Sequence, residues 1–144
     1  MFQLIERNGN LFIDCPQNMA LAHCVSVDLK MSQGIAWQFR QRFGQLPYLK
    51  TQIKSVGECA ILQHETRLVF YMSTKMRYYM KPSYHTLQRA LIALKQYMLA
   101  SGVQELAIPG YLACGRDKLN WSHVKQIICN VFVDTNIKMY VYYL

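Results

Sequence analysis

Hydrophobic runs of membrane-spanning length are missing from this sequence of 144 residues, because no apolar stretch approaches the roughly 20 residues that a bilayer requires. The first residues, Met1 to Glu6, lack the basic and then apolar layout of a secretory signal. Acidic residues are also few, since 8 Asp and Glu stand against 16 Lys and Arg, which gives a formal net charge of +8. We therefore expect an intracellular protein, in the nucleus or the cytoplasm, with no membrane partner.

Closely spaced cysteines, as in metal-binding or redox motifs, are absent too. The 5 cysteines are odd in number and widely spaced, no Cys-x-x-Cys pair occurs, and no histidine lies at a spacing typical of zinc sites. We expect buried, reduced thiols, no metal site and no cofactor. The cysteines are Cys15, Cys24, Cys59, Cys114 and Cys129.

Linkers, repeats and low-complexity segments do not occur, so the sequence offers no domain boundary. Hydrophobic residues make up 52% of the chain, which is enough for a packed core, and 144 residues is the size of one ordinary domain. We expect residues 1–144 to form a single domain.

Strands and helices are predicted to alternate along the chain. The predicted strands are Phe2 to Arg7, Met19 to Ser26, Cys59 to Gln63, Arg67 to Thr74, Leu106 to Ile108 and Ile137 to Tyr143. The predicted helices are Gly34 to Phe43, a long helix between the cap residue Ser83 and Gly102, and Ser122 to Phe132. The apolar run from Met19 to Ser26 is typical of a strand covered on both faces, and His23 within it is expected to be a core histidine with its hydrogen bonds satisfied. This order predicts a three-layer α/β/α sandwich.

Two loops with small residues follow predicted strands, where ligands bind in such sheets. Residues 28–34 precede a helix, whose first amide groups and positive dipole end favour a phosphate. Residues 109–117 contain Gly110, Ala113 and Gly115, which let backbone amides approach an anion closely. Most such turns bind nothing, so each loop alone is a weak signal.

Further segments accompany these loops along nearly the whole chain. They are Ala20-Leu21-Ala22-His23-Cys24-Val25-Ser26, Met31-x-x-Gly34-Ile35-Ala36, Phe39 to Gly44, Val69 to Lys75, Lys81-Pro82-x-Tyr84, Leu87-Gln88, Gly102-Val103, Cys114-Gly115-x-Asp117-x-Leu119-x-Trp121 and Asn136-Ile137-Lys138-x-Tyr140-Val141-Tyr142-x-Leu144. Together they resemble the macro domain, most closely its branch of terminal ADP-ribose protein glycohydrolases. The resemblance implies an α/β/α sandwich with a mixed, mostly parallel sheet.

The resemblance also implies an activity, which is the release of ADP-ribose from Glu and Asp of modified proteins and the deacylation of O-acyl-ADP-ribose. The catalytic lysine and aspartate of that branch match Lys75 and Asp117. A lysine at a buried strand end can lose its proton through desolvation and attack the anomeric carbon of the distal ribose. The aspartate would relay protons.

Ligand-binding positions follow from the same resemblance. They are Asn10, Leu11, Ser26, Ser32, Gln33, Gly34, Ile35, Gly110, Tyr111, Leu112, Ala113, Cys114, Gly115, Arg116 and Leu144. Three of these depart from the family pattern. Asn10 replaces an aspartate that accepts a hydrogen bond from adenine, Ser32 replaces a glycine, and Ala113 replaces a glycine in a loop that is one residue longer than usual.

The departures keep two alternatives to the enzyme open. One is a module that binds ADP-ribose or another nucleotide without cleaving it. The other is a basic protein that binds a polyanion, because residues 66–104 contain no acidic residue and interleave Lys and Arg with tyrosines. That stretch, taken as 67–95, is either a surface for nucleic acid or poly-ADP-ribose, or a solvated loop beside half-buried tyrosines, and the second interpretation is favoured. We expect a monomer.

Overall fold

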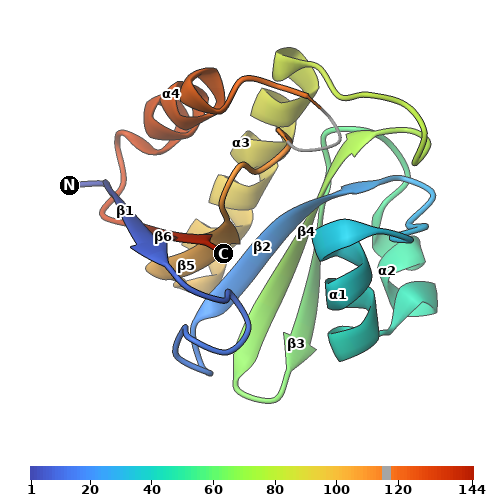
Figure 1. Cartoon of the computed structure of the whole chain (residues 1–144), viewed down its shortest axis with the longest axis horizontal. Coiled ribbons are helices and arrows are strands. Elements are labelled where there is room, and N and C mark those ends of the chain that lie inside the picture. The colour runs from blue at the N-terminus through green and yellow to red at the C-terminus, as the bar shows by residue number, and fades with distance from the viewer. Residues whose placement is uncertain (115–117) are drawn as a thin grey trace.

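The computed structural model describes residues 1–114 and 118–144, and its centre is a six-stranded sheet (Figure 1). The strands are β1 (Gln3–Asn8), β2 (Ala20–Ser26), β3 (Cys59–His64), β4 (Arg67–Lys75), β5 (Glu105–Pro109) and β6 (Lys138–Tyr143). Their order across the sheet is β1-β6-β5-β2-β4-β3. All neighbouring pairs are parallel except β3 and β4, which form the predicted antiparallel hairpin. The mixed, mostly parallel sheet is therefore confirmed.

Within the described residues, four helices cover the two faces of this sheet. They are α1 (Gly34–Phe43), α2 (Leu46–Gln52), α3 (Tyr84–Ser101) and α4 (Trp121–Phe132). Leu87, Leu94 and Ile128 of α3 and α4 are fully buried against one face. Phe39 and Leu49 of α1 and α2 are fully buried against the other. Two cores on opposite faces make the predicted α/β/α sandwich, which is confirmed.

The long helix α3 begins and ends as the sequence predicts. The Ser83 hydroxyl accepts a hydrogen bond from the Thr86 amide at 3.1 Å, and the Thr86 hydroxyl accepts one from the Ser83 amide at 3.0 Å. At the other end, Gly102 has a φ of 69°, a left-handed conformation that glycine adopts without strain.

Helix α2 was not predicted from the sequence. It has only 7 residues, which is too short for an apolar stripe to repeat, and Leu49 is its buried residue. Pro47 lies in its first turn, where a proline is tolerated because the early amides have no partner within a helix.

A buried arginine holds the loop between β1 and β2 against the sheet. Arg67 is only 5% exposed, and it donates hydrogen bonds to the carbonyl oxygens of Met19 and Pro16, each at 2.9 Å, and to the Cys15 sulfur at 3.2 Å. Its charge is therefore satisfied inside the protein and is not part of an outer basic surface.

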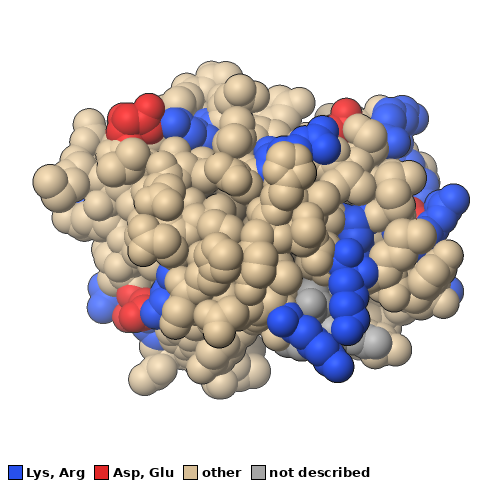
Figure 2. Space-filling model, turned by 90° about the horizontal axis from the view of Figure 1, so that it is seen from above, with Lys and Arg blue, Asp and Glu red and all other residues tan. Residues whose placement is uncertain are grey.

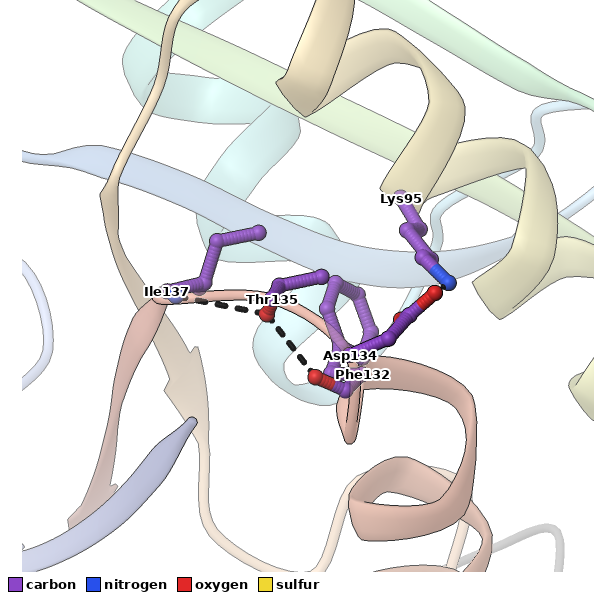
Figure 3. Close-up of polar contacts among 5 residues, drawn as sticks. All are labelled: Lys95, Phe132, Asp134, Thr135 and Ile137. Carbon is purple, nitrogen blue, oxygen red and sulfur yellow. Dashed lines mark hydrogen bonds and ion pairs between the residues drawn. The ribbon is translucent and has the colours of Figure 1, made fainter. Parts of the chain in front are cut away.

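The turn between α4 and β6 is fixed by a small polar cluster (Figure 3). The buried Thr135 hydroxyl donates to the Phe132 carbonyl at 2.8 Å and accepts from the Ile137 amide at 3.3 Å. On the surface beside it, Lys95 of α3 forms an ion pair with Asp134 at 2.6 Å, and this hydrogen bond lowers the pKa of Asp134. The cluster joins the end of α4 to α3 and sets the start of β6.

Among the described residues, no helix is both long enough and apolar enough to span a membrane.

Candidate functional site

A cavity of about 360 Å³ opens at the carboxyl ends of β2 and β4, beside the start of α1 and the loop that follows β5. Ten of the ligand-binding and catalytic positions expected from the sequence line it. They are Ser26, Ser32, Gln33, Gly34, Ile35, Lys75, Gly110, Tyr111, Leu112 and Ala113. Residues separated by up to 87 positions in the chain (from Ser26 to Ala113) thus meet at one edge of the sheet, where a parallel sheet places its ligand.

The start of α1 forms one wall of this cavity. Residues 32–36 line it, no acidic residue lies in the first turn of the helix, and no described side chain caps the turn. Gly34 has a φ of 62°, and a side chain there would meet open space rather than protein. Early helix amides that lack partners and face a cavity can bind an anion such as a phosphate.

The loop after β5 forms the opposite wall. The Gly110 amide donates to the Tyr142 carbonyl at 2.8 Å, which holds the loop against β6. A Cβ atom on Gly110 would lie 2.4 Å from the ring of Tyr143, so only glycine fits at this position. That ring is itself fixed, because the Tyr143 hydroxyl donates to Glu6 at 2.6 Å and accepts from the Trp121 indole at 2.7 Å.

Ala113 in this loop has a φ of 62°, the conformation that glycine would adopt freely. The left-handed region costs an L-residue about 1–2 kcal/mol, and the greater freedom of glycine in the unfolded chain offsets part of that. We expect Ala113→Gly to raise the free energy of unfolding by up to about 1 kcal/mol in urea titrations. Ala100→Gly, at an exposed position in α3, should lower it by up to about 1 kcal/mol. Equal losses in the two variants would contradict the assigned strain.

Lys75 is the last residue of β4 and lines the cavity. Its carbonyl accepts a hydrogen bond from the Val27 amide at 2.8 Å, and the register between β2 and β4 shifts by one residue between Val25 and Ser26. The shift brings Lys75 opposite Ser26. The half-buried Lys75 is therefore held by backbone pairing at the strand end where the cavity opens.

Asp28 connects the loop before α1 to the residues that follow Lys75. Its carboxylate accepts hydrogen bonds from the Ser26 hydroxyl, from the Lys30 amide at 3.3 Å and from the Tyr78 amide at 3.1 Å. Partial burial disfavours the charged form, but these hydrogen bonds outweigh it and the pKa of Asp28 is lowered. Asp28 thus links the loop before α1 to the segment that follows β4.

Four expected ligand-binding residues do not line this cavity. The Asn10 side-chain oxygen accepts from the amides of Phe12 at 2.9 Å and Ile13 at 3.2 Å, so it closes a local turn. Leu11 is buried in the core beside α1, Cys114 packs against the α3 core, and Leu144 is almost fully exposed. Gly115, Arg116 and Asp117 lie outside the described residues.

His23 and Thr74 also line the cavity, although neither was predicted to be a site residue. His23 is fully buried and stacks on Phe39 with ring centroids 3.7 Å apart. Burial lowers the pKa of His23 to about 3, so the ring is neutral. The expectation of satisfied hydrogen bonds is wrong, because both ring nitrogens lack a partner among the described residues, as does the buried Thr74 hydroxyl. The sequence signal for Thr74 is its place next to Lys75.

The basic stretch from residue 67 to residue 95 does not form one continuous surface. Arg67 is buried and Lys95 is paired with Asp134, as described above. Arg77 and Lys81 are exposed between β4 and α3, on the side of the molecule where β4 ends.

A second, larger hollow of about 660 Å³ lies at the opposite end of the sheet. Residues at the starts of β2, β5 and β6 line it, including Ala20, Glu105 and Lys138. It contains none of the residues expected to bind ligand. Across residues 1–114 and 118–144, no three His, Cys, Asp or Glu side chains gather in a way that could hold a metal ion.

Comparison with known proteins places this geometry in a family. No protein-family profile matches the chain. The human ADP-ribose glycohydrolase OARD1 is 43% identical over 134 residues, which cover 93% of this chain and 87% of the human protein. The macrodomain of Thermus aquaticus DarG superposes with a TM-score of 0.84 at 24% identity over 99% of both chains. Thermosipho africanus DarTG in complex with ADP-ribose superposes with a TM-score of 0.80 at 18% identity, over 97% of this chain and 42% of that one. The chain therefore has the macrodomain fold and belongs to the family of the ADP-ribose glycohydrolase OARD1.

Proposed function

We propose that this protein binds ADP-ribose in the cavity of about 360 Å³ and hydrolyses the bond between ADP-ribose and acidic side chains of modified proteins. The general activity, that of an ADP-ribose-binding hydrolase, follows from 43% identity to an ADP-ribose glycohydrolase. One observation carries the proposal: a single cavity unites residues at the start of α1, the loop after β5 and Lys75.

The two phosphates of ADP-ribose would be bound mainly by backbone amides. Those at the start of α1 carry no capping side chain among the described residues, and the loop after β5 approaches from the opposite wall. Because the binding groups are amides rather than Lys or Arg side chains, the affinity for ADP-ribose should depend only weakly on salt. The net charge of +8 then needs another explanation.

Lys75 would be the nucleophile. Its Nζ atom, once deprotonated, would form a bond to the anomeric carbon of the distal ribose, and the bond from that carbon to the acceptor carboxylate would break. The carboxylate leaves with the electron pair. Water would then attack the same carbon and release the lysine. Asp117 is proposed to carry the protons in both steps, and the same cavity would admit O-acyl-ADP-ribose.

Two alternatives remain distinguishable by experiment. The internal turn made by Asn10 and the strained Ala113 favour a module that binds ADP-ribose without turnover. The exposed Arg77 and Lys81 favour a protein that binds a polyanion.

Two measurements distinguish the hydrolase, the binding module and the polyanion-binding protein. One is calorimetric titration with ADP-ribose at two salt concentrations, and the other is an assay of ADP-ribose release from a glutamate-ADP-ribosylated protein. If the proposed function is right, the titration shows a heat of binding at both salt concentrations. The assay then shows that ADP-ribose is liberated from the modified protein. Binding with no liberation would identify the module. Absence of any heat, with tight and strongly salt-dependent binding of an oligonucleotide, would identify the polyanion-binding protein and overturn the proposal.

A further inference from the structure

The segment between β4 and α3 forms an exposed rim beside the cavity. We name residues 76–81 the rim loop; it directly follows Lys75. Four of its apolar and aromatic side chains are at least 41% exposed, and together they make a contiguous exposed group. They are Met76, Tyr78, Tyr79 and Met80. Tyr78 also lines the cavity, so the rim loop and the candidate site are continuous.

The rim loop carries positive charge. Arg77 and Lys81 are exposed, and Lys30 from the loop before α1 places its ammonium 4.3 Å from the centre of the Tyr78 ring. Asp28 is an acidic residue bound to this segment; its carboxylate accepts the hydrogen bonds described above and also attracts Arg77, which leaves Lys30 and Lys81 as the excess of positive charge. In Figure 2, which views the molecule from the side where β4 ends, Lys and Arg outnumber Asp and Glu in the right half.

The ring geometry does not suit stacked nucleobases. A single strand of nucleic acid stacks successive bases on accessible, roughly parallel ring faces. Here the planes of Tyr78 and Tyr79 are at 88° to each other, with centroids 5.4 Å apart. One face of Tyr78 is already covered by Lys30. The cations and the exposed methionines remain as the groups that a ligand can contact.

The position of the rim loop indicates which part of a substrate reaches it. If Lys75 attacks the anomeric carbon, the acceptor side chain departs from the cavity next to Lys75, and the chain that bears it passes over residues 76–81. A polypeptide offers carboxylates to Arg77 and Lys81 and apolar atoms to Met76 and Met80.

We infer that the rim loop binds the acidic polypeptide segment that flanks the modified residue of the acceptor protein. This inference rests on the proposed function, because only a glycohydrolase that acts on proteins has an acceptor chain at this position. The rim loop would therefore set a preference among acceptor proteins, while the cavity recognises the ADP-ribose that they share.

Two synthetic peptides with the same ADP-ribosylated glutamate test this inference. One carries Asp and Glu on both sides of the modified residue, and the other carries Asn and Gln. At low salt we expect kcat/KM to be roughly fivefold higher for the acidic peptide, and we expect this ratio to fall as salt rises. The double substitution Arg77→Gln with Lys81→Gln should bring the ratio close to one. The matched control, Lys50→Gln with Lys138→Gln, removes the same charge from α2 and from the start of β6 and should keep the ratio.

Each contrary outcome has a distinct meaning. Equal kcat/KM for the two peptides with the unmodified protein would overturn the inference, as would an equal loss in the control. Oligoadenylate and an unmodified acidic peptide can each be added as inhibitors of peptide cleavage. Stronger inhibition by oligoadenylate, lost when Arg77 and Lys81 are substituted, would show that the rim loop binds a nucleotide strand instead. If neither peptide is cleaved, the proposed function fails. Fluorescence anisotropy then measures the affinity for each peptide and tests separately whether the rim loop binds an acidic segment. Tighter binding of the acidic peptide that requires Arg77 and Lys81 would support the inference about the rim loop, and equal binding of the two peptides would overturn that inference.

Discussion

Lys75→Ala is expected to lower the rate of ADP-ribose release from a glutamate-ADP-ribosylated protein by at least about 10³-fold, because the variant lacks the attacking atom. The dissociation constant for ADP-ribose should change by less than about threefold, since the phosphates are proposed to bind backbone amides at the start of α1 and in the loop after β5, which line the cavity together with Lys75. Single-turnover assays measure the rate and calorimetry measures the affinity. Lys50→Ala, an exposed lysine of α2 outside the cavity lining, is the control and should match the unmodified protein in both.

A second substitution separates nucleophilic attack from electrostatic assistance. Lys75→Arg keeps the positive charge, but a guanidinium stays protonated and cannot form the bond to the anomeric carbon. We expect this variant to be as inactive as Lys75→Ala. Mass spectrometry of the intact protein after an acid quench should find one ADP-ribose bound to the unmodified chain and none bound to either variant. Turnover within tenfold of normal in Lys75→Arg would reject the lysine as nucleophile.

Acidification is expected to destabilise the fold through His23. Burial lowers the pKa of this side chain from 6.5 to about 3, so between these values the unfolded chain binds a proton that the folded chain does not. Stability from the neutral ring is fully present above about pH 6.5 and is lost as the pH falls towards 3. The loss is about 1.4 kcal/mol per pH unit, or about 3 kcal/mol at about pH 4.5.

Urea unfolding at pH 7 and pH 4.5, in the unmodified protein and in His23→Leu, measures this contribution. Carboxylates with lowered pKa values, such as Asp28 and Glu58, also destabilise the fold at low pH, but they do so equally in both proteins. The difference between the two pH sensitivities therefore isolates His23. His85→Gln, at an exposed position of α3, should behave as the unmodified protein does. Equal pH sensitivity in His23→Leu would show that protonation of the core is not responsible.

The elements that the sequence predicts are those with strong local signals. The β3–β4 hairpin has a run of apolar residues on each side of a polar turn, and α3 has a serine cap, a stripe of three leucines and one methionine, and a terminal glycine. Helix α2 has none of these, because one buried leucine sets no period. The order of the strands across the sheet depends on contacts between distant segments, and residue patterns within a segment do not specify those contacts.

The candidate site also contains residues that the sequence could predict and others that it could not. The rule that ligands bind at the carboxyl ends of parallel strands points to residues 28–34, residues 109–117 and the segment after Thr74, and the resemblance to the macro domain singles out Lys75. The structure brings residues 32–34, Lys75 and residues 110–113 to one cavity. Asn10 shows what the rule misses. Its side chain can accept a hydrogen bond from a ligand or from its own backbone, and only the three-dimensional arrangement of Phe12 and Ile13 shows which is made. Pairing of Lys75 with Asp117 stays a prediction, because Asp117 lies outside the described residues.

Strand β6 lies between β1 and β5, so the first strand of the chain has the last as its neighbour. During synthesis, β1 leaves the ribosome before β6 and lacks its partner strand until residues 138–143 have followed it. The sheet is therefore completed only after residues 138–143 have been made, and a premature stop before residue 138 would leave both β1 and β5 with an unpaired edge.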